Sequence, residues 1–240
     1  MLGWSLGLLA YALLIVVTFP STKGINFDQL AEDLKFFMGG AQTLSSLEGY
    51  LTSQIFYAPL ALGIYAVFLS ARLVATEIRS GGMDFLLSHP LSRFRVIAAK
   101  FLALTAVVSI LSLIFAVGLW LAGLLIEDEL TFMEGLLVGI NLVPIVLVYG
   151  SFGFCLACTL KRRGAILGYG SAFAVSTWVL HGLSLSSELL SDIEEWTVFH
   201  WYATGKPFSD GLVPAHMSIL VVLSAALFVI SVWQFNRRDI

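Results

Sequence analysis

The chain has 240 residues, of which 58% are hydrophobic and only 12% carry a charge. Soluble globular domains contain about 25% charged residues, so the composition excludes a soluble protein and indicates a membrane protein with several spans. The formal net charge of −3 is small. It gives no sign of a nucleic-acid partner, because such proteins carry strongly basic surfaces.

Six segments are long and apolar enough to cross a bilayer, whose hydrocarbon core of about 30 Å requires roughly 20 helical residues. The first segment has neither the basic start nor the small-residue cleavage site of a signal peptide, so we expect it to be retained. We therefore predict an all-α polytopic membrane protein with six transmembrane helices, in which residues 1–240 form a single domain. The predicted spans cover residues 1–19, 50–74, 97–126, 132–160, 165–185 and 213–235.

The basic residues are distributed unevenly between the two sides of the predicted bundle. If the loop around Pro90 lies in the cytosol, ten of the 13 lysines and arginines are on that side, and only Lys23, Lys35 and Lys206 lie opposite. By the positive-inside rule, both termini and the Pro90 loop are then cytosolic. We expect a multi-pass protein of the plasma (inner) membrane.

Two segments on the external side differ from simple loops. Residues 26–38 place apolar side chains at helical spacing and polar ones on the other face, which predicts a short amphipathic helix on the membrane surface. Residues 186–214 mix aromatic, aliphatic and acidic residues and predict an interfacial or partly re-entrant hairpin. A solvated linker with incidental aromatic residues is the alternative for this second segment.

The loop between the second and third spans, residues 76–95, contains glycines, arginines and a short apolar run. Gly81 and Gly82 interrupt the helix, because each glycine costs about 1 kcal/mol in a helix interior. A short coupling helix follows, with an apolar surface from Met83 to Leu87, and Pro90 ends it. An exposed apolar turn flanked by charges favours docking into a groove of a soluble subunit. The alternative is an interfacial helix that rests on lipid headgroups.

A specific residue order runs through this region: Glu77, then the run Ser80–Arg93 with its glycines, Leu-Leu, proline and Ser-Arg, then Lys100. The last span ends in the run Phe235–Asp239. In these residues, in its six spans and in its length, the chain resembles the permease subunits of ABC transporters of the type-2 exporter class.

The resemblance implies a half-transporter with no cofactor of its own. The loop would dock into a separate ATP-binding subunit, which holds ATP and Mg²⁺, and a second permease chain, identical or different, would complete the translocation path. Lys161, Arg162 and Arg163 would form a second contact, although simple anchoring by the positive-inside rule explains this cluster equally well. The implied coupling residues in the loop are Glu77, Arg79, Gly81, Gly82, Met83, Asp84, Phe85, Leu86, Leu87, Pro90, Arg93 and Arg95.

The chain lacks the G-x-x-x-x-G-K-[ST] phosphate loop, and the nearest string, Gly205-Lys206-Pro207, has neither the upstream glycine nor the hydroxyl residue. We therefore do not expect it to be an enzyme. Because the predicted spans bury no charge, we expect a hydrophobic or amphipathic substrate of the drug, lipid or lipopeptide class. The candidate path residues are Ser109, Ser112, Asn141, Pro144, Tyr149 and Ser176.

Other candidate sites carry weaker signals. Cys155 and Cys158 have C-x-x-C spacing, but they lie inside the fourth span without a nearby histidine, so we expect them to pack. No histidine pair has metal-ligand spacing, and we expect no metal site. Small residues that would allow close helix approach in a dimer occur at Gly3/Gly7, Gly135/Gly139 and Gly164/Gly168.

Two other functions stay open. A non-transporting membrane scaffold or immunity protein would use the same loop to bind its partner. An intramembrane enzyme would need paired carboxylates, a histidine cluster or a serine-based dyad at membrane depth, and the sequence shows none of these.

Overall fold

The computed structural model describes residues 2–22, 36–37, 44–79, 92–126, 130–186, 188–202, 206–209 and 211–237. All regular secondary structure in these ranges is helical. Six helical segments among the described residues are long and apolar enough to cross a membrane. The predicted all-α fold with six spans is confirmed.

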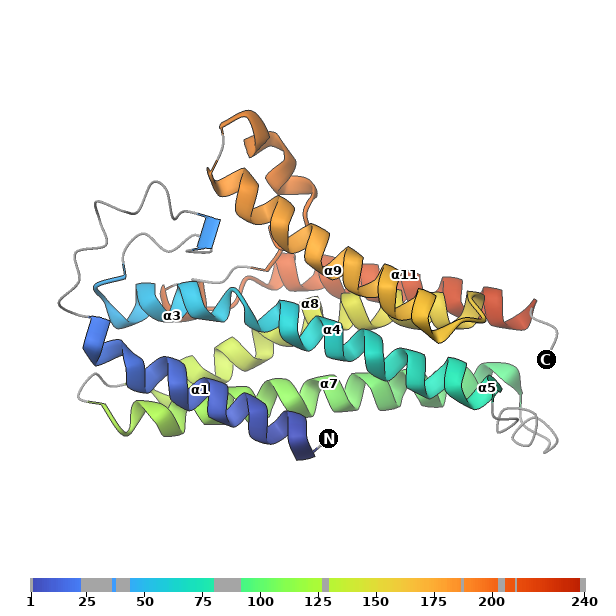
Figure 1. Cartoon of the computed structure of the whole chain (residues 1–240), viewed down its shortest axis with the longest axis horizontal. Coiled ribbons are helices and arrows are strands. Elements are labelled where there is room, and N and C mark those ends of the chain that lie inside the picture. Colours follow the sequence, from blue (N-terminus) through green and yellow to red (C-terminus); the bar gives the residue numbers. More distant parts are fainter. Residues whose placement is uncertain are drawn as a thin grey trace.

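Each predicted span corresponds to one segment of the bundle (Figure 1). Five spans are single helices, namely α1 (Leu2–Thr22), α7 (Arg93–Gly123), α8 (Phe132–Thr159), α9 (Arg163–Ser186) and α11 (Pro214–Asn236). The second span consists of α3 (Leu47–Ile55), α4 (Ala58–Ala71), the π-helical η2 (Arg72–Thr76) and α5 (Glu77–Arg79). Two short helices, η3 (Glu188–Trp196) and α10 (Lys206–Ser209), lie between α9 and α11.

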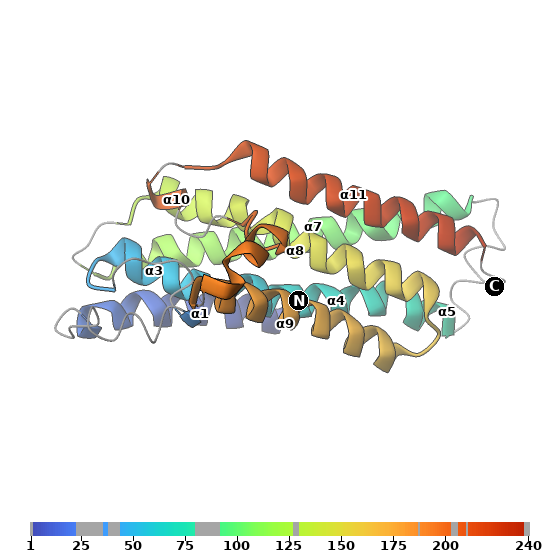
Figure 2. The ribbon, with the colours of Figure 1, turned by 90° about the horizontal axis from the view of Figure 1, so that it is seen from above.

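The spans run along one long axis, so the bundle has two ends (Figures 1 and 2). At one end, on the right of Figure 1, α5 ends, α7 begins, α8 turns into α9, and α11 ends; we call this the basic end. At the other end α3 begins, α7 ends and α8 begins, and η3 lies on the same half of the bundle; we call this the hairpin end. The helix α1 begins part-way along the bundle, where the ring of Trp4 lies 4.6 Å from the ring of Tyr65.

The second span is interrupted, a feature that the sequence analysis missed. The chain turns at Phe56 and Tyr57, between α3 and α4. Pro59 lies in the first turn of α4, where its missing N–H removes no helical hydrogen bond. The same proline inside a continuous helix would remove one bond and clash with the preceding turn, so the break is located just before it.

The helix α8 lies at the centre of the bundle and packs against α4, α7 and α11 (Figure 2). Glycine permits this close approach: a Cβ at Gly139 would lie 2.6 Å from the Cβ of Ala116 and 2.9 Å from the carbonyl oxygen of Ser112, both on α7. A Cβ at Gly135 would lie 3.0 Å from the carbonyl oxygen of Ala116. The Gly135/Gly139 pair therefore serves the contact between α7 and α8, and not the dimer contact that its spacing suggested.

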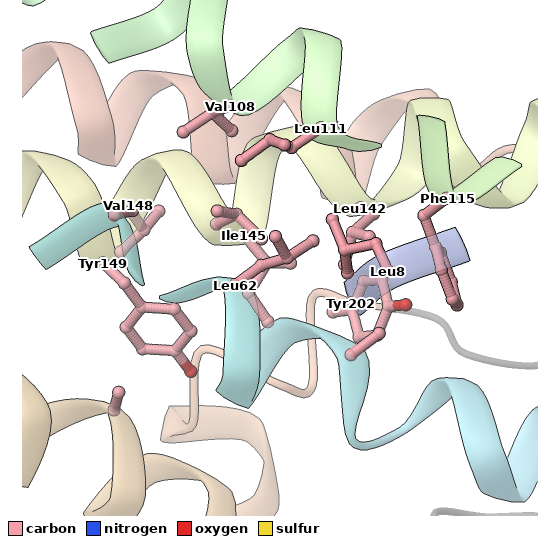
Figure 3. Close-up of a cluster of buried hydrophobic side chains, with 14 of the residues drawn as sticks. Leu8, Leu62, Val108, Leu111, Phe115, Leu142, Ile145, Val148, Tyr149 and Tyr202 are labelled. Atoms are coloured by element: carbon pink, nitrogen blue, oxygen red, sulfur yellow. The ribbon is translucent and has the colours of Figure 1, made fainter. Parts of the chain in front are cut away.

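Buried side chains from three spans meet beside α8 (Figure 3). Leu62 comes from α4, Val108 and Leu111 come from α7, and Ile145 and Val148 come from α8 itself. Because lipid tails are as apolar as these side chains, close packing rather than exclusion of water stabilises the cluster.

The segment after α9 folds back onto that helix. Phe199 is buried, and its ring centroid lies 5.4 Å from that of Phe56 and 5.7 Å from that of His181. Trp196, by contrast, is 87% exposed. The burial of Phe199 argues against a solvated linker here, whereas the amphipathic helix predicted at residues 26–38 lies outside the described residues except for 36–37.

Candidate coupling site

The structure describes both ends of the predicted coupling loop. Residues 80–91 lie outside the described residues, and these include Gly81, Gly82, Met83, Asp84, Phe85, Leu86, Leu87 and Pro90. On the near side, α5 ends at Arg79, and on the far side, α7 begins at Arg93. The geometry of the site is therefore built from the helix ends that flank the loop.

The start of α7 is fixed by a side-chain cap. The hydroxyl of Ser92 accepts a hydrogen bond of 3.2 Å from the backbone N–H of Arg95, which satisfies one of the free donors of the first turn. The helix thus begins four residues before the predicted start at Ile97. Its first turn contains Arg93 and Arg95 and no acidic residue, although a helix N-terminus disfavours positive charge.

An ion pair joins the two sides of the loop. The ammonium group of Lys100 on α7 donates a hydrogen bond to the carboxylate of Glu77 on α5. The Lys100 side chain is only 11% exposed, while that of Glu77 is 38% exposed. Both residues belong to the motif identified in the sequence, and the fold places them in contact. The pair holds the end of the second span against the start of the third.

Arg93 connects the loop to the last span. Its guanidinium donates long hydrogen bonds of 3.5 Å to the carbonyl oxygens of Phe235 and Asn236 at the end of α11. The last carbonyls of a helix have no partner within the helix, and positive charge is favourable there. Arg93, predicted as a partner contact, therefore also contacts the chain's own C-terminal helix.

The predicted second contact divides into two parts. Lys161 and Arg162 are exposed in the turn between α8 and α9. Arg163 is half-buried, and its guanidinium carbon lies 5.3 Å from the ring centre of Phe68 on α4, a cation–π contact. Arg163 thus anchors α9 to α4, and the two exposed residues are left as candidates for a partner.

A polar contact near the same end was not predicted. Gln234 on α11 accepts hydrogen bonds from the hydroxyl of Thr159, at 2.5 Å, and from the thiol of Cys155, at 3.3 Å. Cys155 and Cys158 form no disulfide, and Cys158 is buried. The sequence could have indicated this contact, because an amide side chain inside an apolar span usually forms a hydrogen bond with a polar group on a neighbouring helix.

Side chains thus link the helix ends at the basic end to one another or to a neighbouring span. Comparison with known families then shows to which kind of protein this bundle belongs. Residues 3–240 match the family described as ABC-2 family transporter protein. The chain belongs to this family. Its members are the membrane-spanning permease components of ABC transporters and are not themselves ATPases. A comparison with curated proteins gives no match.

In this ABC-2 permease the candidate path residues lie on different helix faces. Tyr149 is fully buried, and its hydroxyl is 2.8 Å from the hydroxyl of Thr177 on α9. Ser112, Asn141 and Pro144 are also buried. Ser109 is half-buried and Ser176 is exposed, so the single chain does not gather the six into one cluster. Among the residues described, no group of three or more His, Cys, Asp or Glu can hold a metal ion.

Proposed function

We propose that this chain is one permease subunit of an ATP-driven exporter, and that it forms a translocation path with a second permease chain. The observation that carries this proposal is the linkage at the basic end. Glu77 and Lys100 join the second span to the third, and Arg93 joins the start of the third to the end of the last. A push on residues 80–91 would therefore reach three spans at once.

The energy comes from separate ATP-binding subunits that hold ATP and Mg²⁺. The exposed Lys161 and Arg162, together with the exposed Arg95, offer positive charge to an acidic face of such a subunit. The two arginines in the first turn of α7 interact unfavourably with the helix dipole, whose positive end lies there. Such a local loss of stability is typical of a functional surface. The basic end, toward which the start of α1 also points (Figure 1), then faces the cytosol at the plasma (inner) membrane, with both termini on the cytosolic side.

The substrate is hydrophobic or amphipathic, in the range of drugs, lipids and lipopeptides. Charged residues of the described spans lie close to the helix ends, as Glu48, Arg72, Lys100, Glu134 and Arg163 do. A path for a bare ion would need a ring of ligands at membrane depth. Mild hydroxyl and amide groups instead suit an apolar molecule with a few hydrogen-bonding groups.

The proposal is tested by purifying the chain together with the ATP-binding subunit that it retains and measuring ATPase activity. We expect the wild-type chain to stimulate the ATPase, and we expect Leu86→Asp with Leu87→Asp to abolish stimulation while the bundle stays folded. The control variant, Ile193→Asp with Trp196→Asp, carries the same charge change at exposed positions of the hairpin end and should retain stimulation. Undiminished stimulation by the Leu86/Leu87 variant would contradict the proposal.

A further inference from the structure

A groove lies between α1 and the break that separates α3 from α4. Its volume is about 770 Å³, within the range of roughly 300–1,000 Å³ that is usual for small-molecule sites. Gly3, Gly7 and Leu8 of α1 form an apolar wall, while Tyr11, Gln54 and Tyr57 lie toward the hairpin end. None of the described residues that line the groove is charged.

The two glycines make the groove possible. A Cβ at Gly3 or Gly7 would meet no atom within 4 Å, in contrast to Gly139, which is packed against α7. Glycine in a helix interior, as at Gly7, costs about 1 kcal/mol relative to alanine, and no contact with a described residue offsets that cost. The open space beside Gly3 and Gly7 therefore has room for a molecule that lies against α1.

The polar side of the groove is built by the break in the second span. The hydroxyl of Tyr11 donates a hydrogen bond of 2.9 Å to the carbonyl oxygen of Gln54, the residue just before the turn. The hydroxyl of Tyr57 donates to the carbonyl oxygen of Phe37 at 3.1 Å. The oxygen of Tyr57 remains able to accept a hydrogen bond, and a glutamine amide can both donate and accept.

A second observation comes from Tyr202 of the hairpin segment. Its side chain is 2% exposed, and its hydroxyl finds no hydrogen-bond partner among the described residues. Burial, and to a smaller extent the nearby phenol of Tyr11, raise the pKa of Tyr202, so the hydroxyl is neutral. Figure 3 shows Tyr202 in the same cluster as Leu8, which lines the groove. An unpaired buried hydroxyl is unfavourable, so the region behind Leu8 holds a polar group that the described residues do not satisfy.

We propose that this groove binds a neutral single-chain amphiphile from the bilayer. The hydrocarbon chain lies against Gly3, Gly7 and Leu8, and the uncharged hydrogen-bonding head lies at Gln54 and Tyr57. A phosphate or carboxylate head is disfavoured, because burying an unpaired charge is costly and the described lining of the groove contains no cation. Neighbouring residues such as Leu2 and Leu6 are exposed, so the groove is open to lipid.

The test uses the chain alone in lipid nanodiscs, without ATP or partner, and a monoacylglycerol that carries a photoreactive diazirine in its acyl chain. We expect ultraviolet light to label peptides from α1 and from residues 47–65. Gly7→Leu should lower this labelling by about fivefold or more, because the added side chain fills the groove. Gly168→Leu, at a glycine on α9 that is equally open, should leave it unchanged.

The head group is tested by Gln54→Leu with Tyr57→Phe. This variant should lower labelling by the monoacylglycerol by about threefold or more, which is the change expected when at least one hydrogen bond to the head group is lost. Labelling by a diazirine alkane, which has no head group, should stay unchanged. Equal labelling by a diazirine phosphatidylcholine would indicate ordinary lipid contact and overturn the proposal. Disulfide cross-linking of two Gly3→Cys chains with no monoacylglycerol labelling would assign the groove to a second copy and also overturn it. Neither result bears on ATP-driven transport, which this experiment does not involve.

Discussion

The pairing of Glu77 with Lys100 places charge where the helix ends leave the bilayer. Lys100 is largely buried and Glu77 is about one-third exposed, so the pair is neither a surface ion pair nor a fully desolvated one. Exposed pairs contribute about 0–1 kcal/mol, whereas removing one partner of a buried pair costs about 3–5 kcal/mol. For the Glu77–Lys100 pair we expect that removing one partner lowers the free energy of unfolding by an amount between these two values.

Replacing Lys100 tests whether the pair transmits motion. We expect Lys100→Met to lower the free energy of unfolding by about 1–2 kcal/mol and to reduce ATPase stimulation, because α5 is no longer held against α7. The exchange Glu77→Lys with Lys100→Glu should restore part of both quantities. Full stimulation by Lys100→Met would show that the pair only stabilises the fold.

The hydrogen bond between Tyr149 and Thr177 ties α8 to α9. We expect Tyr149→Phe to destabilise the bundle by about 0.6–1.7 kcal/mol, as found for side-chain hydrogen bonds between membrane helices. Tyr169→Phe is the control, because that side chain is 64% exposed. The measurement is unfolding in mixed micelles, and equal unfolding free energies for the two variants would contradict the assignment.

The helices α7 and α8 pack so closely at Gly139 that there is no room for a side chain between them. Gly139→Ala would bring a methyl group to 2.6 Å from the Cβ of Ala116, so the helices must move apart, and we expect a loss of about 1–3 kcal/mol. Gly168→Ala adds the same methyl group in open space and should be neutral or stabilise by up to about 1 kcal/mol. Thermal unfolding measures both, and similar effects of the two substitutions would contradict the α7–α8 packing.

The sequence predicted the helices better than it predicted their ends and contacts. Composition identifies six spans because the bilayer demands long apolar segments. It placed the third span at Ile97, since Arg93 and Arg95 are charged, whereas Ser92 caps a helix that continues beyond the apolar stretch. The break at residues 56–57 was missed although Pro59 signalled it.

The candidate site was predicted in part, for a similar reason. The motif identified Glu77, Arg93 and Lys100 as residues of one region, and the structure adds which atoms they contact. Arg93 contacts the carbonyls of α11 because the ends of these two spans lie side by side. Residue spacing along the chain does not show which span ends are neighbours. The spacing of Gly135 and Gly139 likewise indicates a close helix contact but does not show that the partner helix, α7, belongs to the same chain.

For the whole molecule, the uneven burial of the spans suggests where a second chain packs. The most apolar stretch of α8 is 72% buried, whereas those of α1 and α11 are 28% and 17% buried. Close packing drives helix association in lipid, so α11, which is the least buried span and takes no part in the groove beside α1, has most surface left for a partner. The proposed function requires a second permease chain, and we propose that it packs against α11, which leaves α8 at the centre of each half.

The most direct test of ATP-driven export is transport by the purified complex in sealed vesicles. With the ATP-binding subunits and Mg²⁺ present, we expect ATP to drive a fluorescent amphiphile across the membrane, and we expect the variant Leu86→Asp with Leu87→Asp to assemble but not transport. A complex that hydrolyses ATP under the control of this chain and yet moves no amphiphile would contradict the account and favour a non-transporting scaffold.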